Sequence, residues 1–284
     1  MGSRIALLDD RAVLSVSGDD RHAFLQGLLT ADVLALAPGQ AAPAALLTPQ
    51  GKILFLFLVV ETAGRTLIDC SATQADDLVK RLSMYKLRSK VTIVREADLA
   101  VAMVLDGDAP VPEGGVAFVD PRWSGLGVRL IAPRAALAAI ATAKASDARS
   151  LRLAAGVAEA DEIGSGNLFP HEANLDQNAG VSFTKGCYVG QEVVSRMEHR
   201  GTARSRLVRV NGASLAPGAA ITAGERSIGE VVAVEGENGI ALLRLDRLSA
   251  AKAAGTDPAV DGKPVAVRAP EGTRFPLDAP AGDA

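Results

Sequence analysis

The longest purely apolar run in this chain is only eight residues long, and it limits the folds that the chain can adopt. The run covers Ile53 to Val60 and lies between Lys52 and Glu61. A membrane-spanning helix takes about 20 apolar residues. A short apolar run between charged residues is typical of a buried β-strand. With 48% hydrophobic and 22% charged residues among 284, the sequence predicts a globular protein of two or three domains and no membrane partner.

The other local patterns predict short strands and short helices in irregular alternation. The strands expected before the middle of the chain cover residues 5–8, 12–16, 45–47, 53–60, 91–94 and 99–105, and the first two are expected to form a hairpin. The expected helices start at 19–20 or cover about 75–85, 134–144, 149–155 and 191–197, and one more short strand is expected at 181–183. From Arg206 onward, short apolar runs alternate with Gly-rich turns, which is typical of a small all-β barrel or sandwich.

Cysteine, histidine and charge counts exclude several classes of protein. Two cysteines, Cys70 and Cys187, are too few for a disulfide scaffold or a four-cysteine metal site, and the three histidines show no metal-ligand spacing. We therefore expect no bound metal. A net charge of −3, a pI near 5.7 and 4% aromatic residues disfavour nucleic acid as a partner. The N-terminal residues show no export signal, so a cytoplasmic location is expected.

The most informative segment surrounds the second cysteine. Gly186 and Gly190 bracket Cys187, so we expect a tight turn there that needs glycine at both positions. A helix is expected to follow Gly190, and Lys185 lies two residues before the thiol. Both features favour the thiolate. The alternative is that Cys187 is a small buried side chain without a chemical role. Cys70 lies in an expected strand, and a structural role is predicted for it.

Positive charge is concentrated in the same part of the chain. Residues 185–209 carry six basic and two acidic side chains, a net charge of +4, although the whole chain is acidic. A local basic patch of this kind indicates an anionic partner of limited size. The alternative is a solvated helix whose charges form salt bridges.

Several segments together resemble one known family. The run Lys185-Gly-Cys-Tyr-Val-Gly-Gln-Glu192 is similar to the signature of the YgfZ family. These are folate-binding proteins that support the assembly and repair of iron–sulfur clusters, and they are built like the aminomethyltransferase (T-protein) of the glycine cleavage system. Further segments with this resemblance are 24–33, 48–52, 170–175 and 180–183, so it covers about residues 1–205.

This resemblance implies an α+β fold of three domains, arranged as in the aminomethyltransferase (T-protein) cloverleaf around a central channel. The first domain is expected to be discontinuous and folate-binding, built from 1–50 and 150–203. An inserted α+β domain is expected at 51–149, and a C-terminal β-barrel at 204–284.

The resemblance also implies a function and a set of site residues. The expected function is that of a tetrahydrofolate-binding accessory factor for the assembly or repair of iron–sulfur proteins, with client iron–sulfur proteins or cluster-assembly proteins as partners. Cys187 is the expected functional thiol, and Lys185 is expected to hold it as the thiolate. Folate binding, expected to be weak, is assigned to Gly186, Tyr188, Gly190, Gln191, Glu192, Arg196 and Arg200, with the two arginines on the glutamate tail.

The alternative function is folate-dependent aminomethyl transfer, and three departures from the transferase pattern disfavour it. The resemblance implies an acidic residue just after the hairpin at Gly51, but residues 52–60 contain no acid. A glutamate of the pterin site is replaced by Ala154, and an aspartate is replaced by Cys187. An alanine cannot accept hydrogen bonds from a pterin ring. Whether the protein is an enzyme is therefore left open.

Overall fold

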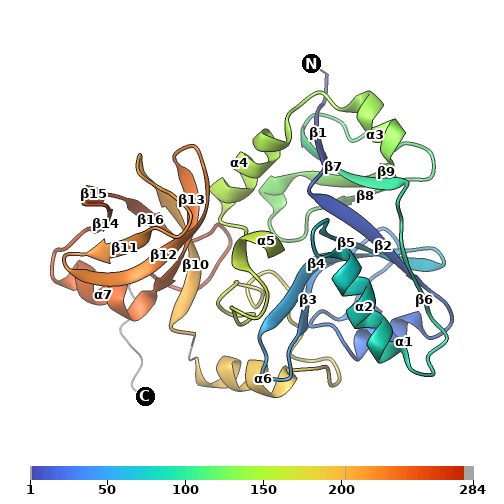
Figure 1. Ribbon diagram of the computed structural model, residues 1–284, viewed down its shortest axis with the longest axis horizontal. Helices are drawn as coiled ribbons and strands as arrows, with labels where there is room; N and C mark the ends of the chain where they lie inside the picture. The colour runs from blue at the N-terminus through green and yellow to red at the C-terminus, as the bar shows by residue number, and fades with distance from the viewer. Residues whose placement is uncertain (1, 202, 278–284) are drawn as a thin grey trace.

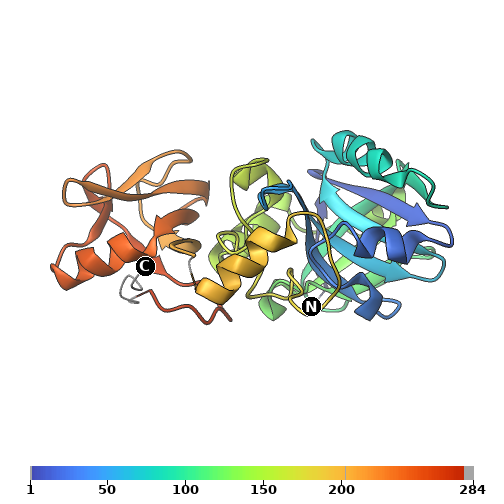
Figure 2. The same ribbon diagram turned by 90° about the horizontal axis from the view of Figure 1, so that it is seen from below.

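The computed structural model describes residues 2–201 and 203–277, which contain three β-sheets (Figures 1 and 2). Two antiparallel sheets, of five and four strands, lie at one end of an elongated molecule. A seven-stranded sheet forms the other end, and short helices and a long irregular segment lie between the two ends.

The five-stranded sheet has the order β3-β4-β5-β2-β6. Its strands are β2 (Arg11–Ser17), β3 (Ala41–Leu47), β4 (Ile53–Thr62), β5 (Arg65–Ser71) and β6 (Thr92–Arg95). The eight-residue apolar run forms most of β4, as predicted. The helices on this sheet are α1 (Arg21–Gln26), the 3-10 helix η1 (Val33–Ala35) and α2 (Ala75–Lys86). Phe24 of α1 and Leu78 of α2 share one hydrophobic core with Phe57 of β4, so both helices are held by burial of their apolar faces.

The four-stranded sheet has the order β1-β7-β9-β8. Its elements are β1 (Arg4–Leu8), β7 (Leu99–Asp106), β8 (Val116–Val119), the 3-10 helix η2 (Ser124–Leu126), β9 (Val128–Pro133) and α3 (Arg134–Ile140). The expected hairpin of the first two strands is wrong, because β1 pairs with β7 whereas β2 pairs with β5 and β6. The chain passes between sheets at Asp9 and Asp10, which puts Leu8 and Val13 into the core between them.

One expected domain boundary falls inside the five-stranded sheet, and another falls inside a helix. Residue 50 lies in the turn that joins β3 to β4, and these two strands pair along their length. The five-stranded sheet therefore contains residues from both sides of that boundary. Residue 150 lies inside α4 (Ala145–Ala155), which ends as predicted at Gly156, a glycine with a φ of +82°.

The segment between the two ends of the molecule contains α4, α5 (Ala160–Ile163), a loop rich in turns, and α6 (Gln191–Arg200). The strand expected at 181–183 is wrong: these residues have no strand structure, and the Ser182 N–H donates a single hydrogen bond to Thr30 O. An apolar run of three residues is too short to specify a strand where turns surround it.

The C-terminal sheet is a nearly closed barrel, in agreement with the predicted all-β region. Its order is β15-β14-β11-β12-β13-β10-β16. The elements are β10 (Ser205–Asn211), β11 (Ala220–Ala223), β12 (Arg226–Glu235), β13 (Asn238–Arg244), α7 (Leu245–Ala253), β14 (Pro258–Val260), β15 (Lys263–Pro264) and β16 (Ala266–Arg268). The outer strands β15 and β16 follow one another in the chain, with only the buried Val265 between them, so the two edges of the sheet meet.

Candidate functional site

The loop that carries the cysteine is anchored by a buried lysine. Lys185 is only 8% exposed, and its Nζ donates to Leu29 O at 2.6 Å and to Ala31 O at 2.8 Å. Burial lowers the pKa of Lys185 to about 8, against the opposing effect of Asp32. These hydrogen bonds direct the ammonium towards the backbone after α1. Lys185 therefore anchors the loop, whereas the sequence predicts that it holds Cys187 as the thiolate.

A second anchor is the contact of this loop with the β3–β4 turn. Gly190 has a φ of +82°, and a Cβ there would lie 2.6 Å from Thr48 O and 3.1 Å from the Cα of Gly51. Glycine is thus required at 190 by both conformation and space, as predicted. The same requirement expected at Gly186 is wrong: its φ is not positive, and nothing lies within 4 Å of a Cβ built on it.

The two cysteines lie in opposite environments. Cys187 is exposed, whereas Cys70 is 2% exposed on β5 with its Sγ 3.7 Å from Ala12 O. Burial raises the pKa of the Cys70 thiol to about 12. The structural role predicted for Cys70 fits this position, and the alternative of a buried Cys187 is wrong.

The other predicted site residues divide between the core and the surface. Tyr188 is 7% exposed, its ring centre lies 5.1 Å from Lys185 Nζ, and burial raises its pKa to about 12. Gln191 and Glu192 occupy the first turn of α6. Arg196 and Arg200 are exposed on that helix, and Arg196 pairs with Glu192 at 3.3 Å in the i, i+4 arrangement. The structure therefore brings Tyr188 to Lys185 and leaves the two arginines in solvent.

The predicted basic patch contains fewer exposed cations than the six basic residues counted in the sequence of 185–209. Arg206 is buried and donates to both carboxylate oxygens of Asp176, at 2.6 and 3.0 Å, and Arg209 pairs with Glu271 at 3.2 Å. Lys185 is buried as well. Among the described residues of 185–209, the exposed cations are therefore Arg196, Arg200 and Arg204.

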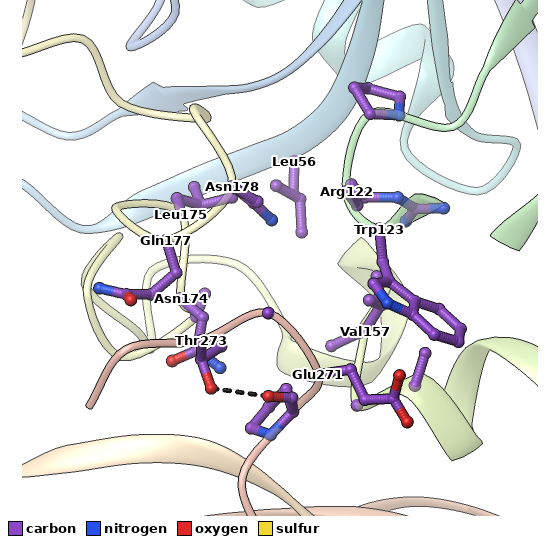
Figure 3. Close-up of a pocket in the computed structure, with 17 residues that line it drawn as sticks. Leu56, Arg122, Trp123, Val157, Asn174, Leu175, Gln177, Asn178, Glu271 and Thr273 are labelled. Carbon is purple, nitrogen blue, oxygen red and sulfur yellow. Dashed lines mark hydrogen bonds between the residues drawn. The ribbon is translucent and has the colours of Figure 1, made fainter. Parts of the chain in front are cut away.

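A cavity of about 210 Å³ lies between the N-terminal sheets, the segment that joins the two ends of the molecule, and the chain after the barrel (Figure 3). Its walls come from β4, the β8–β9 connection, the end of α4, the loop around 173–178 and residues 270–273. Leu56, Trp123 and Val157 give apolar surface, and Figure 3 places Asn174 and Gln177 on the side opposite Trp123. None of the nine predicted site residues lines this cavity. Among its described lining residues, Glu271 is the single carboxylate.

Sequence reasoning missed a buried network of ion pairs beside this cavity. Arg129 is 1% exposed and donates to Asp69 at 2.5 Å and to Asp120 at 2.8 Å. Glu159 accepts hydrogen bonds from Arg11, from Arg129 and from Arg122, which lines the cavity beside Trp123. Three arginines thus balance three carboxylates from both N-terminal sheets and from the start of α5. The sequence signal that could have indicated this network is a charged residue within an apolar strand, such as Asp69 or Arg129.

The fold also brings together three groups that have no metal-ligand spacing in the sequence. Ligand atoms of His171, Asp176 and Glu198 lie within 4.8 Å of one another, and His171 Nε2 is 2.9 Å from Glu198 Oε2. Asp176, however, already pairs with Arg206 through both carboxylate oxygens. The group is therefore organised as an ion-pair cluster that joins the loop, α6 and the barrel.

Comparison with solved structures shows the class of fold. The chain is similar to the glycine cleavage system aminomethyltransferase T of Bartonella henselae, with a TM-score of 0.73 at 18% identity, over 94% of this chain and 84% of that one. Residues 204–275 match the family described as the CAF17 C-terminal beta-barrel domain. The protein therefore has an α+β fold of the aminomethyltransferase type with a nearly closed C-terminal barrel, as predicted.

Sequence relatives show the family. The mitochondrial iron–sulfur cluster assembly factor IBA57 of Mus musculus is 34% identical over 277 residues, which cover 85% of this chain and 77% of the relative. The human protein of that name is 32% identical over 311 residues, with 97% and 83% covered. The chain belongs to the family of iron–sulfur cluster assembly factor IBA57. The narrower relation to YgfZ stays a prediction. In the described ranges, no helix has the length and apolar character needed to cross a membrane.

Proposed function

We propose that this protein is an accessory factor for the assembly or repair of iron–sulfur proteins and that Cys187 is its functional thiol. Relatives that are named iron–sulfur cluster assembly factors support the role. The observation that carries the assignment of the thiol is the contrast between an exposed Cys187 and the anchored loop that holds it. The lysine and glycine contacts fix the backbone on both sides of a side chain that faces solvent.

This arrangement can present a sulfur to a partner protein at low entropic cost. A thiol on a loop that is already ordered loses little conformational freedom on binding. A thiolate is a ligand for iron and a nucleophile towards other sulfur atoms. Client iron–sulfur proteins or cluster-assembly proteins are the proposed partners. The cytoplasmic location remains a prediction, since the names of the relatives include "mitochondrial".

The role is tested by the activity of an enzyme with a labile four-iron–four-sulfur cluster in cells that lack the protein. We expect that activity to fall under oxidative stress and to return when the gene is restored. A cluster-free enzyme measured in the same extracts is the control. Unchanged activity of the cluster enzyme would contradict the proposal.

We also propose that the cavity receives the ring of tetrahydrofolate. Apolar surface from Leu56, Trp123 and Val157 lies opposite Asn174, whose buried Oδ1 has no hydrogen-bond partner among the described residues, a combination that suits a flat heterocycle with hydrogen-bonding edges. Roughly 300–1,000 Å³ is usual for pockets that enclose a drug-sized ligand. The cavity of about 210 Å³ therefore accommodates a ring and not the whole cofactor. Bound folate carries one-carbon groups, and the chain's part is to bind and orient the ring.

Folate binding has a direct optical readout, because Trp123 is the single tryptophan of the chain and lines the cavity. Tetrahydrofolate should quench its fluorescence with a micromolar or weaker dissociation constant, because the cavity encloses only the ring and Ala154, which replaces the glutamate of the transferase pattern, lies outside it. Free N-acetyltryptophanamide is the control for absorption by the ligand. The predicted tail contacts require that the double variant Arg196→Gln/Arg200→Gln binds more weakly and with less dependence on salt. Unaltered binding would refute the tail assignment.

Aminomethyl transfer is less well supported by the site. The part of β4 that faces the cavity is apolar, and Ala154 is an exposed helix residue. A carboxylate to accept a proton from the pterin is missing at both positions that the transferase pattern requires. Formation of methylenetetrahydrofolate from a methylamine donor by the purified protein would restore this alternative.

A further inference from the structure

A second cavity, of about 320 Å³, lies between the end of α4 and the outer face of the barrel. Figure 1 shows α4 beside this part of the barrel. The cavity is lined by Leu153, Ala154, Arg209, Val210, Asn211, Asn238, Gly239, Ala266 and Arg268. Two of these residues are arginines, two are asparagines and, among the described residues that line it, none is acidic. This composition is unusual on a chain with a net charge of −3.

The two arginines are brought together by strand pairing. Arg209 on β10 is directly opposite Arg268 on β16 in an antiparallel ladder, so both side chains project from the same face. Like charges in directly opposed positions destabilise a sheet unless a counter-charge lies between them. Within the described part of the chain, Arg268 is exposed and has no acidic group within ion-pairing distance.

The asparagines extend the same polar surface by one step along the ladder. Asn211 lies two residues after Arg209 on β10, and it is opposite Asn238 on β13. Its Nδ2 donates to Asn238 Oδ1 at 3.2 Å, which leaves further amide hydrogens free to donate. Guanidinium and amide donors on one face of a sheet, with a cavity above them, form a receptor for oxygen atoms that carry negative charge.

One internal group already uses part of this receptor. Glu271 approaches Arg209 at 3.2 Å, and its side chain is 49% exposed, whereas that of Arg209 is 24% exposed. Arg209 also donates to Ala154 O and Ala269 O. The arginine is thus held in place by backbone oxygens, and its one carboxylate partner is a half-exposed side chain that can be displaced.

We propose that this cavity is a binding site for a small oxyanion with two or more negative charges, which bridges Arg209 and Arg268. Phosphate esters and polycarboxylates share this chemistry. The residues that line this site differ from those that line the cavity proposed for folate, although Glu271 of that cavity pairs with Arg209 here. The proposal does not depend on the assignment of folate or of the thiol.

The test is calorimetric titration of the purified full-length protein with pyrophosphate and, separately, with citrate at low ionic strength. We expect binding that Arg268→Gln weakens about tenfold or more, the usual effect of losing one charged hydrogen-bond partner. Arg226, another exposed arginine, lies at the start of β12 and outside the cavity, so Arg226→Gln is the matched control and should leave the affinity nearly unchanged. Whichever probe binds more tightly assigns the ligand as a phosphate or a carboxylate.

A third variant acts in the opposite direction. Glu271→Gln removes the competing carboxylate, so it should tighten binding of the same probe several-fold. Opposite changes from Arg268→Gln and Glu271→Gln identify this site and not general attraction to a basic surface. The proposal is overturned if the wild type binds neither probe, if Arg268→Gln and Arg226→Gln weaken binding equally, or if Glu271→Gln fails to tighten it.

Discussion

Replacement of Gly190 by alanine tests whether the cysteine loop is fixed against the β3–β4 turn. The backbone at Gly190 has a φ of +82°, which costs a non-glycine residue roughly 1–2 kcal/mol. The added Cβ would also lie 2.6 Å from Thr48 O, and relief of such overpacking typically costs about 1–3 kcal/mol. We therefore expect Gly190→Ala to lower the free energy of unfolding by about 3 kcal/mol.

Gly186→Ala is the matched control, because it changes the same residue type in the same loop. Gly186 has no positive φ and no neighbour within 4 Å of a built Cβ. Its replacement should change stability by less than about 0.5 kcal/mol. For a protein of this size, thermal unfolding followed by circular dichroism should show a midpoint lower by roughly 6–12 °C for Gly190→Ala and no resolved shift for Gly186→Ala. Equal midpoints for the two variants would refute the anchoring argument.

Three further predictions concern the buried charges and the two thiols. Arg129→Met removes one of the two arginines that pair with Asp69 and one of the two that pair with Asp120, leaving the buried carboxylates of the network in excess of its arginines, and should cost about 3–5 kcal/mol in urea unfolding. Arg95→Gln, which breaks only an exposed pair with Asp76, should cost less than about 1 kcal/mol. Similar losses would contradict the assigned role of the network. Burial alone would raise the pKa values of Asp120 and Glu159, but the surrounding arginines hold both pKa values well below the ordinary 3.8 and 4.5. The two carboxylates therefore contribute their full stability above pH 4.5, and this contribution is lost as the pH falls. Unfolding midpoints that do not decrease between pH 5 and pH 3 would count against this. Iodoacetamide at neutral pH should label Cys187 in the folded protein and Cys70 only after unfolding, as measured by peptide mass spectrometry, and early labelling of Cys70 would show that β5 opens readily.

Elements with a strong local pattern were predictable from the sequence. A pattern within about ten residues is enough to predict each of three features: the apolar run of β4, the periodic helix α2, and the barrel strands separated by glycines. The partner of a strand is a different matter. Nothing local distinguishes β1 and β2 from a hairpin, since the choice depends on β7 and β5, which lie about 50 to 100 residues later.

The site was predictable only where chemistry is local. A glycine before a helix and an exposed cysteine on a turn follow from the residues around them, and Gly190 and Cys187 agree with that reasoning. The role of Lys185 could not be predicted in this way, because its hydrogen-bond partners lie more than 150 residues earlier in the chain. A similar separation, 148 residues, prevented prediction of the pairing of Arg11 with Glu159.

The measurement that most directly tests the central claim is complementation by Cys187→Ser. The exposed position predicts that this variant folds with a wild-type unfolding midpoint, since the change removes little packing. Cells that carry it in place of the wild-type gene should lose the activity of a four-iron–four-sulfur enzyme, whereas cells that carry Cys70→Ala at the same abundance should keep it. Full activity with Cys187→Ser would contradict the account, because the exposed thiol would then have no part in the maturation of iron–sulfur proteins.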